Sequence, residues 1–303
     1  MLELNEAKGV LSDLVQKEKL ILFAGSGVSV GSGLPTWDGF LVEFIEFCKQ
    51  IRTDYKRYPE VQEAFTDELL SDAASVTSSY PIHVATVLKE KMETLPSRIA
   101  TNIESDFRKW FVRLFTGKTP NNVHNLIART KYPYILTSNY DDLLELAAKD
   151  AGAPHATVSF HQKSLVAEFM YNEQPAIIHV HGTALDAMLN RVVLTSEDYI
   201  RIIKKGVPGF SFALQSLFLR YSTLFVGYGA SDPHLEDLME EFAYCFDFEE
   251  SHTMSKNYLV IRRDKAQSIM DAYKKRMRTE IIVIDDFDQY EDLLEELRSS
   301  APL

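Results

Sequence analysis

The sequence predicts an α/β protein, a Rossmann-like doubly wound parallel sheet with a helical insertion subdomain. Short, continuous apolar runs alternate with segments of helical periodicity, which is typical of parallel strands joined by crossover helices. Glycine or polar residues follow these runs, as expected where buried strands end at a ligand-binding edge. The runs lie at residues 20–24, 134–137, 177–180, 223–226, 258–261 and 281–284.

The first apolar run, residues 20–24, ends abruptly at Gly25-Ser26-Gly27. This pattern predicts a tight turn whose backbone can approach a phosphate. Gly31 follows Gly27 at four residues rather than three, so the full Gly-x-Gly-x-x-Gly fingerprint is absent. Taken alone, the turn is equally well interpreted as a glycine-rich strand end that holds no ligand.

The helices around this strand are predicted from periodicity and capping. Residues 3–17 form a short helix before the strand, and Asp38 caps a helix that continues to Gln50. Residues 52–118 show helical patterns at 61–70, 81–91 and 105–115 and no convincing strand. We interpret this stretch as an insertion that serves as a lid, as a partner surface or as a cover for the sheet.

The second half of the chain continues the alternation of strands and helices. Asp141 and Asp142 stand where a helix would begin, and acidic residues favour the positive end of a helix dipole. We also expect an edge strand at residues 156–159 and a short extended segment at 192–194. Further helices are predicted at residues 121–130, after Ser196, at 214–220, around 235–239, at 265–276 and at 290–298.

Composition indicates an ordinary globular chain, which we treat as one domain over residues 1–303. Hydrophobic residues make up 46% and charged residues 25% of the sequence. No run reaches the roughly 18 apolar residues that a membrane span needs. The acidic N-terminus does not resemble a secretory signal. We therefore expect a soluble, cytoplasmic protein without membrane contact.

The cysteines and the net charge exclude some kinds of site. Cys48 and Cys245 are far apart, so a cysteine zinc site is not expected, and buried free thiols are the simpler interpretation. The formal net charge is −12, and residues 236–250 contain acidic but no basic residues. Direct nucleic-acid binding is not expected, because phosphate contacts need lysine and arginine.

Polar residues at the predicted strand ends suggest a nucleotide site. The turns at Gly25-Ser26-Gly27 and Gly227-Tyr228-Gly229 can present backbone N–H groups to a pyrophosphate. Asp285 follows the last strand and either accepts hydrogen bonds from an adenosine or caps the next helix.

Asn139 and His181 are the more specific candidates for catalytic residues. Each alone is explained as a helix cap or a turn residue. Together they suit a polar reaction, because an imidazole can take a proton from a sugar hydroxyl or a water that an amide orients.

Four motifs follow one another along the chain: Gly-Ser-Gly-Val-Ser (25–29), Thr-Ser-Asn-Tyr-Asp (137–141), His-Val-His-Gly (179–182) and Gly-Tyr-Gly-Ala-Ser-Asp-Pro (227–233). Their order and spacing resemble the motifs of the sirtuin-like superfamily, and within it the bacterial sirtuin-like NAD hydrolases of antiviral defence systems. The resemblance implies that Asn139 and His181 are catalytic. Asp141 either supports the site or is an ordinary first-turn acid. The implied NAD-binding residues are Gly25, Ser26, Gly27, Ser29, Asp141, Gly227, Tyr228 and Asp285.

The chain departs from the deacetylating members of the superfamily. Those proteins carry a four-cysteine zinc module after the catalytic histidine and usually have glutamine where Ser138 stands here. The resemblance therefore implies NAD as the substrate, cleavage of NAD itself and no zinc. The closely spaced His179 and His181 leave a weak metal site conceivable. The alternatives are an NAD-dependent deacylase or ADP-ribosyltransferase, and a non-catalytic sensor that binds NAD or ADP-ribose.

An unregulated NAD hydrolase would be toxic to its own cell, so the implied activity must be gated. We expect a homo-oligomer, with residues 52–118 or the final helix at an interface. We also expect a separate regulatory or sensor protein encoded in the same operon. The biological role that this implies is abortive infection, in which NAD depletion stops phage growth.

Overall fold

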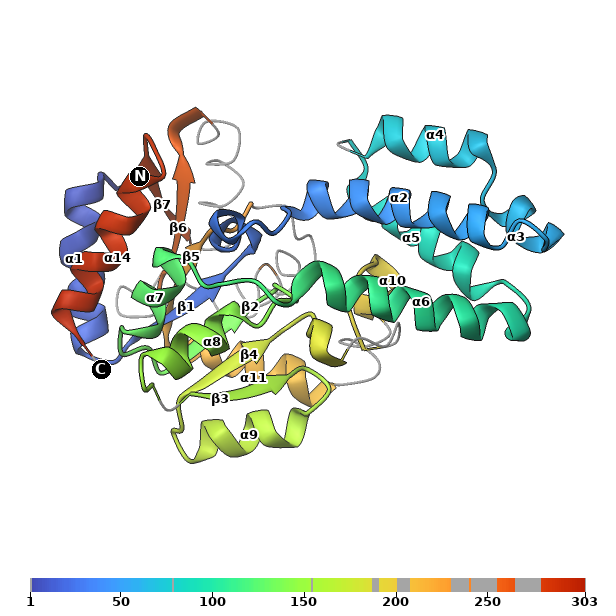
Figure 1. Cartoon of the computed structure of the whole chain (residues 1–303). Coiled ribbons are helices and arrows are strands. Elements are labelled where there is room, and N and C mark those ends of the chain that lie inside the picture. The colour runs from blue at the N-terminus through green and yellow to red at the C-terminus, as the bar shows by residue number, and fades with distance from the viewer. Residues whose placement is uncertain are drawn as a thin grey trace.

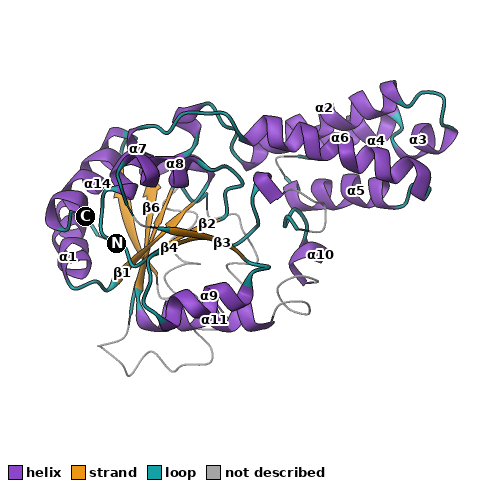
Figure 2. Cartoon of the chain, turned by 60° about the horizontal axis from the view of Figure 1, so that its bottom comes forward, coloured by secondary structure: helices purple, strands orange, loops and turns teal. Residues whose placement is uncertain are grey.

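A computed structural model describes residues 2–77, 79–153, 155–186, 191–200, 208–229, 240, 255–264 and 279–302. A parallel sheet with helices on both faces forms the body of the protein, and a lobe of helices projects from it (Figures 1 and 2). The predicted doubly wound α/β fold is confirmed.

The sheet has seven strands in the order β3-β4-β2-β1-β5-β6-β7, and every neighbouring pair is parallel. Ala24 at the end of β1 lies opposite Thr137 of β2 and Val226 of β5, and Thr137 lies opposite His179 of β4. The carboxyl ends of these strands are therefore level. The strands are β1 (Leu20–Ala24), β2 (Tyr134–Thr137), β3 (Ala156–Ser159), β4 (Ala176–His179), β5 (Ser222–Val226), β6 (Asn257–Arg262) and β7 (Thr279–Ile284).

Alternate residues of β1 enter two different cores. Ile21 and Phe23 pack beneath α9 (Lys163–Tyr171) and α11 (Pro208–Arg220) on one face. Leu20, Leu22 and Ala24 belong to the core of the other face. The strand is buried on both sides, which explains its continuous apolar sequence. The second face is covered by α1 (Leu4–Gln16), α7 (Asn122–Ala128), α8 (Leu143–Asp150) and α14 (Asp288–Ser300).

The projecting lobe has its own apolar core, rich in phenylalanine (Figure 2). It begins at Trp37 rather than near residue 52, because α2 packs against the helices that follow it. A buried ion pair joins Lys89 of the lobe to Asp198, which follows Thr195 in the neighbouring segment. The helices are α2 (Trp37–Asp54), α3 (Pro59–Ala64), α4 (Asp67–Val76), α5 (Pro81–Glu93) and α6 (Ser97–Phe115), with the short α10 (Ser196–Tyr199) against α5.

Local capping differs from the prediction at α2 and α4. The Thr36 side chain accepts a hydrogen bond from Gly39 N, so Thr36 rather than Asp38 caps α2. The helix predicted at residues 61–70 is divided at Phe65, because Thr66 caps a new helix through Leu69 N. Where two helix starts are possible, the sequence alone does not show which backbone N–H a side-chain oxygen will bind.

The structure confirms that Cys48 is a buried thiol. None of the helices in the described ranges is both long and apolar enough to cross a membrane. Several predicted features lie outside the described residues: Cys245, the end of the glycine motif at 230–233, the helices at 235–239 and 265–276, and all of the acidic stretch 236–250 except Glu240.

Candidate functional site

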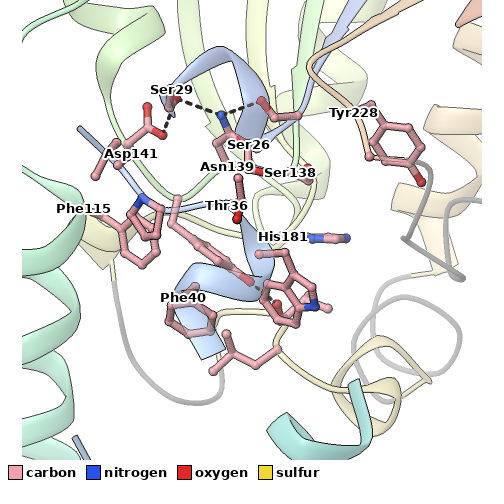
Figure 3. A pocket seen from close by; sticks show the side chains of 18 of the residues that line it. Ser26, Ser29, Thr36, Phe40, Phe115, Ser138, Asn139, Asp141, His181 and Tyr228 are labelled. Carbon is pink, nitrogen blue, oxygen red and sulfur yellow. Dashed lines mark hydrogen bonds between the residues drawn. The ribbon is translucent and has the colours of Figure 1, made fainter. Parts of the chain in front are cut away.

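A pocket lies where the carboxyl ends of the central strands meet the base of the helical lobe (Figure 3). Its polar wall comes from the segments that follow β1, β2, β4 and β5, and its apolar wall comes mainly from the lobe and the loop before it. The lining residues are Gly25, Ser26, Ser29, Leu34, Pro35, Thr36, Trp37, Phe40, Ile82, Phe115, Ser138, Asn139, Tyr140, Asp141, His181, Val193, Leu194, Thr195, Tyr228 and Gly229.

The glycines after β1 and β5 allow two loops to pack backbone against backbone. Gly27 N donates to Gly227 O at 2.9 Å. A Cβ atom at Gly25 would lie 2.6 Å from Gly227 O, and one at Gly27 would lie 2.8 Å from the same atom. Gly227 itself has a φ of +62°, a left-handed conformation that favours glycine. Gly27 and Gly227 thus support the turn from behind, whereas Gly25 and Ser26 reach the pocket.

The Asn139 side chain is held in one orientation. Its Nδ2 atom donates to Gly25 O and to Ser29 Oγ, each at 3.1 Å. Because the Gly25 carbonyl can only accept, the nitrogen and not the oxygen must face it. The residue is 7% exposed, and Oδ1 has no hydrogen-bond partner among the described residues. A buried acceptor without a partner carries a free-energy cost. Because Asn139 lines the pocket, a ligand or water bound there is the candidate partner for Oδ1.

Ser29 is the centre of a buried network behind Asn139 (Figure 3). Its Oγ donates to Asp141 Oδ2 at 2.9 Å and lies 3.2 Å from His124 Nε2. Burial raises the pKa of Asp141 to about 6, although hydrogen bonds from Ser29 and Leu143 oppose the shift. Burial also lowers the pKa of His124 to about 4, so this imidazole is neutral at pH 7.

Sequence reasoning missed His124, whose role depends on a helix cap. Asn121 and His124 form a capping box at the start of α7, and Asn121 Nδ2 donates to Val28 O at 2.8 Å. This bond fixes the start of α7 against the turn that contains Ser29. The spacing of a capping residue and a polar residue three positions later was the available signal.

His181 lies in the loop that follows β4 and lines the pocket with Asn139. Its backbone carbonyl accepts from Val193 N at 3.0 Å, and Gly182 turns the chain with a φ of +87°. The structure therefore brings together Asn139 and His181, as well as Gly25, Ser26, Ser29, Asp141 and Tyr228, at one pocket.

Aromatic residues that were not predicted to belong to the site form the opposite wall of the pocket. The rings of Trp37 and Phe40 stack with centroids 5.3 Å apart, and the Phe115 ring lies 5.7 Å from Phe40. Tyr140, next to Asn139, packs on Phe115 and donates its hydroxyl to Val193 O at 2.6 Å. The pocket thus has a polar wall on the sheet side and an aromatic wall on the lobe side.

Asp285 is not brought into the pocket. It is exposed after the edge strand β7, where its Oδ1 accepts from Arg263 Nε at 2.6 Å. Its side chain does not cap α14 either. The prediction assumed that all strand ends converge, but β7 is separated from β1 by β5 and β6 in the sheet.

The described residues contain no group of three or more His, Cys, Asp and Glu side chains that could hold a metal ion. His179 and His181 do not form the metal-binding pair considered from their spacing. Both ring nitrogens of His179 already face protein acceptors, Asn139 O at 3.0 Å and Glu145 Oε1 at 2.6 Å.

The sheet is that of a doubly wound α/β domain, and its pocket lies at the carboxyl edge, where such sheets bind their ligands. Comparison with known families is more specific. Residues 133–282 match the SIR2-like domain. The similarity to sirtuin-like proteins predicted from the motifs is confirmed.

Named relatives are similar over most of this chain at low identity. The chain is 22% identical to the NAD(+) hydrolase ThsA of Cytobacillus dafuensis over 94% of its own length and 53% of that protein. It is 20% identical to the ThsA of Enterococcus faecium over 95% and 56% of the two chains. Defense-associated sirtuin 2 of Bacillus subtilis is 21% identical over 73% of this chain and 19% of its own length. The chain thus spans about half the length of the ThsA proteins that it resembles.

Proposed function

We propose that this protein is an NAD+ glycohydrolase that cleaves the nicotinamide–ribose bond to give nicotinamide and ADP-ribose. The observation that carries the proposal is the fixed Asn139 amide, whose Oδ1 has no partner in the part of the chain that the structure describes, in a residue that lines the same pocket as His181. The relatives named as NAD(+) hydrolases support the choice of substrate.

The chemistry follows from the bond that is broken. Nicotinamide leaves NAD+ as a neutral molecule, so the leaving group needs no proton, and the ribose carbon passes through an oxocarbenium-like state. The carbon–nitrogen bond breaks as a water oxygen bonds to the same carbon. In our proposal Asn139 Oδ1 accepts a hydrogen bond from that water or a ribose hydroxyl, and the His181 imidazole takes the proton that the water loses.

The two walls of the pocket suit the two parts of the substrate. Trp37, Phe40 and Phe115 offer aromatic surface to a flat cationic ring, which aromatic faces attract. The turn at Gly25 and Ser26 lies on the polar side, where backbone N–H groups favour a pyrophosphate.

The biological part of the proposal is NAD depletion in anti-phage defence through abortive infection, in keeping with the name of the Bacillus subtilis relative. Such an activity requires gating in the cytoplasm. Homo-oligomerisation and a separate regulatory protein from the same operon are the gating elements that we propose.

Product analysis tests the proposal against its enzymatic alternatives. Purified protein is incubated with NAD+, alone and with the product of the neighbouring gene, and with or without an acylated peptide. We expect nicotinamide and ADP-ribose in equal amounts, independent of the peptide. Peptide-dependent nicotinamide release would instead indicate a deacylase or transferase, and NAD binding without turnover under every condition would indicate a sensor.

A further inference from the structure

His179, the last residue of β4, is a charged group buried beneath the proposed catalytic asparagine. The residue is 1% exposed. Its Nδ1 lies 3.0 Å from the backbone carbonyl oxygen of Asn139, and its Nε2 lies 2.6 Å from Glu145 Oε1 in α8. A carbonyl and a carboxylate are both acceptors, so each ring nitrogen faces a group that requires a proton on it. The geometry therefore selects the doubly protonated imidazolium.

The electrostatics of the pair agree with this geometry. Burial works against the charged imidazole, but the charge and hydrogen bond of Glu145 and the Asn139 carbonyl outweigh it and raise the pKa of His179. Burial likewise opposes ionisation of Glu145, and His179 reverses this effect and lowers the pKa of that carboxyl. Asp141, also nearby, further favours the imidazolium.

The carbonyl that His179 holds lies just beyond the regular sheet. Strand β2 ends at Thr137, so the sheet ladder does not extend to Asn139. The backbone N–H of Asn139 is held by Thr137 Oγ1 at 3.0 Å, and its side chain is held by Gly25 and Ser29. His179 thus provides the remaining anchor. Within the described ranges, every polar atom of Asn139 except Oδ1 then has a protein partner.

We infer that His179 and Glu145 are positioning residues, which hold the backbone of Asn139 so that its Oδ1 meets the reacting water or ribose hydroxyl. This inference rests on the proposed NAD-cleaving function. His179 acts through Asn139 and does not itself contact substrate. Its substitution should therefore change the rate of the bound complex more than the binding of NAD.

Three substitutions test this role. His179→Leu fills a similar volume without a donor, and we expect kcat to fall by about 10²-fold, the cost of misplacing a reacting group by roughly 1 Å, while KM changes less than about threefold. His179→Asn retains a donor near the former Nδ1 and should recover most of the lost kcat. His155→Leu is the matched control, because His155 precedes β3 at the opposite end of the parallel sheet.

These results separate positioning from general support of the fold. Equal losses in His179→Leu and His179→Asn, or a loss that appears in KM rather than kcat, would overturn the inference. Wild-type kcat in folded His179→Leu would also overturn it. Thermal unfolding of each variant shows whether a lower rate reflects a smaller folded fraction.

A pH profile gives a second readout. Glu145→Gln removes the carboxylate that holds the His179 proton, so the ring should lose that proton at lower pH. The alkaline limb of kcat should shift to lower pH accordingly. Asp141, Asp142 and His124 also lie near this pair, and all are retained in the variant. An unchanged alkaline limb would contradict a role for the imidazolium.

NMR tests this inference independently of the proposed function. In protein with ¹⁵N-labelled histidine and asparagine, His179 should show both ring nitrogens protonated at pH 7. The Asn139 side-chain amide signals should move in His179→Leu but not in His155→Leu. A singly protonated His179 or an unmoved Asn139 amide overturns the inference, whether or not NAD is cleaved. Absence of NAD cleavage by wild type, both alone and with the neighbouring gene product, overturns the proposed function instead.

Discussion

At the scale of residues, the site consists of hydrogen-bonded polar groups. Neighbours that can only accept a hydrogen bond determine which atom of each group carries the proton. The Gly25 carbonyl fixes the Asn139 amide, and Asp141 fixes the Ser29 hydroxyl. Asp141 is the member of this network most sensitive to pH, because burial raises its pKa to about 6.

The raised pKa of Asp141 predicts a pH-dependent stability. A carboxyl group with a higher pKa in the folded state stabilises the fold below its unfolded pKa, and the contribution is lost as pH rises through about 6. Asp141→Asn has no such titration. The free energy of unfolding of wild type, relative to this variant, should therefore fall by up to about 3 kcal/mol between pH 4 and pH 7.

Urea denaturation of both proteins across this pH range measures the difference. His124 titrates in the same range, but it is present in both proteins and largely cancels. A stability difference that does not vary with pH would mean that Asp141 has an ordinary pKa in the folded protein.

The sequence identified Asn139, His181 and Ser29 because polar residues after apolar runs stand out. For His124 it offered only the spacing of the capping box, and for Glu145 it offered no signal, since each reaches the site from a helix through a tertiary contact. His179 was visible, but its spacing from His181 suggested only a conceivable weak metal site, and its two acceptors are known from the structure alone.

At the scale of elements, the pocket depends on the contact between the turn after β1 and the turn after β5. Gly27 and Gly227 meet backbone to backbone there, with no room for a side chain. The aromatic wall depends in turn on α2 and α6, which carry Phe40 and Phe115 toward the strand ends.

Gly27→Ala tests the contact between the two turns. The new Cβ would lie 2.8 Å from Gly227 O and 2.9 Å from Gly227 Cα, so one backbone segment must move. We expect a loss of about 1–3 kcal/mol in the free energy of unfolding, as for other overpacked sites.

Gly9→Ala is the matched control. In the middle of α1, the added Cβ would meet no described atom within 4 Å beyond its chain neighbours and the backbone of its own helix. This variant should gain about 0.5–1 kcal/mol from helix propensity. Equal effects of the two substitutions would show that the turns are not in close contact.

At the scale of the whole molecule, the alternation of strands and helices was predictable because buried parallel strands appear as uninterrupted apolar runs. The order of strands in the sheet was not predictable, and this explains Asp285, which follows a strand end but lies at the far edge. The contribution of the helical lobe to the pocket was also hidden, because it arises from packing between segments distant in the sequence.

The most direct test of the central claim is the rate of nicotinamide release by folded Asn139→Ala and His181→Ala, under the conditions in which wild type is active. Each variant should lose about 10²–10⁴-fold in kcat, the usual contribution of a positioned proton acceptor or its partner. The control variant Asn172→Ala, at the exposed C-cap of α9, should retain the wild-type rate. Wild-type turnover in either folded pocket variant would contradict the assignment of this pocket as the site of NAD cleavage.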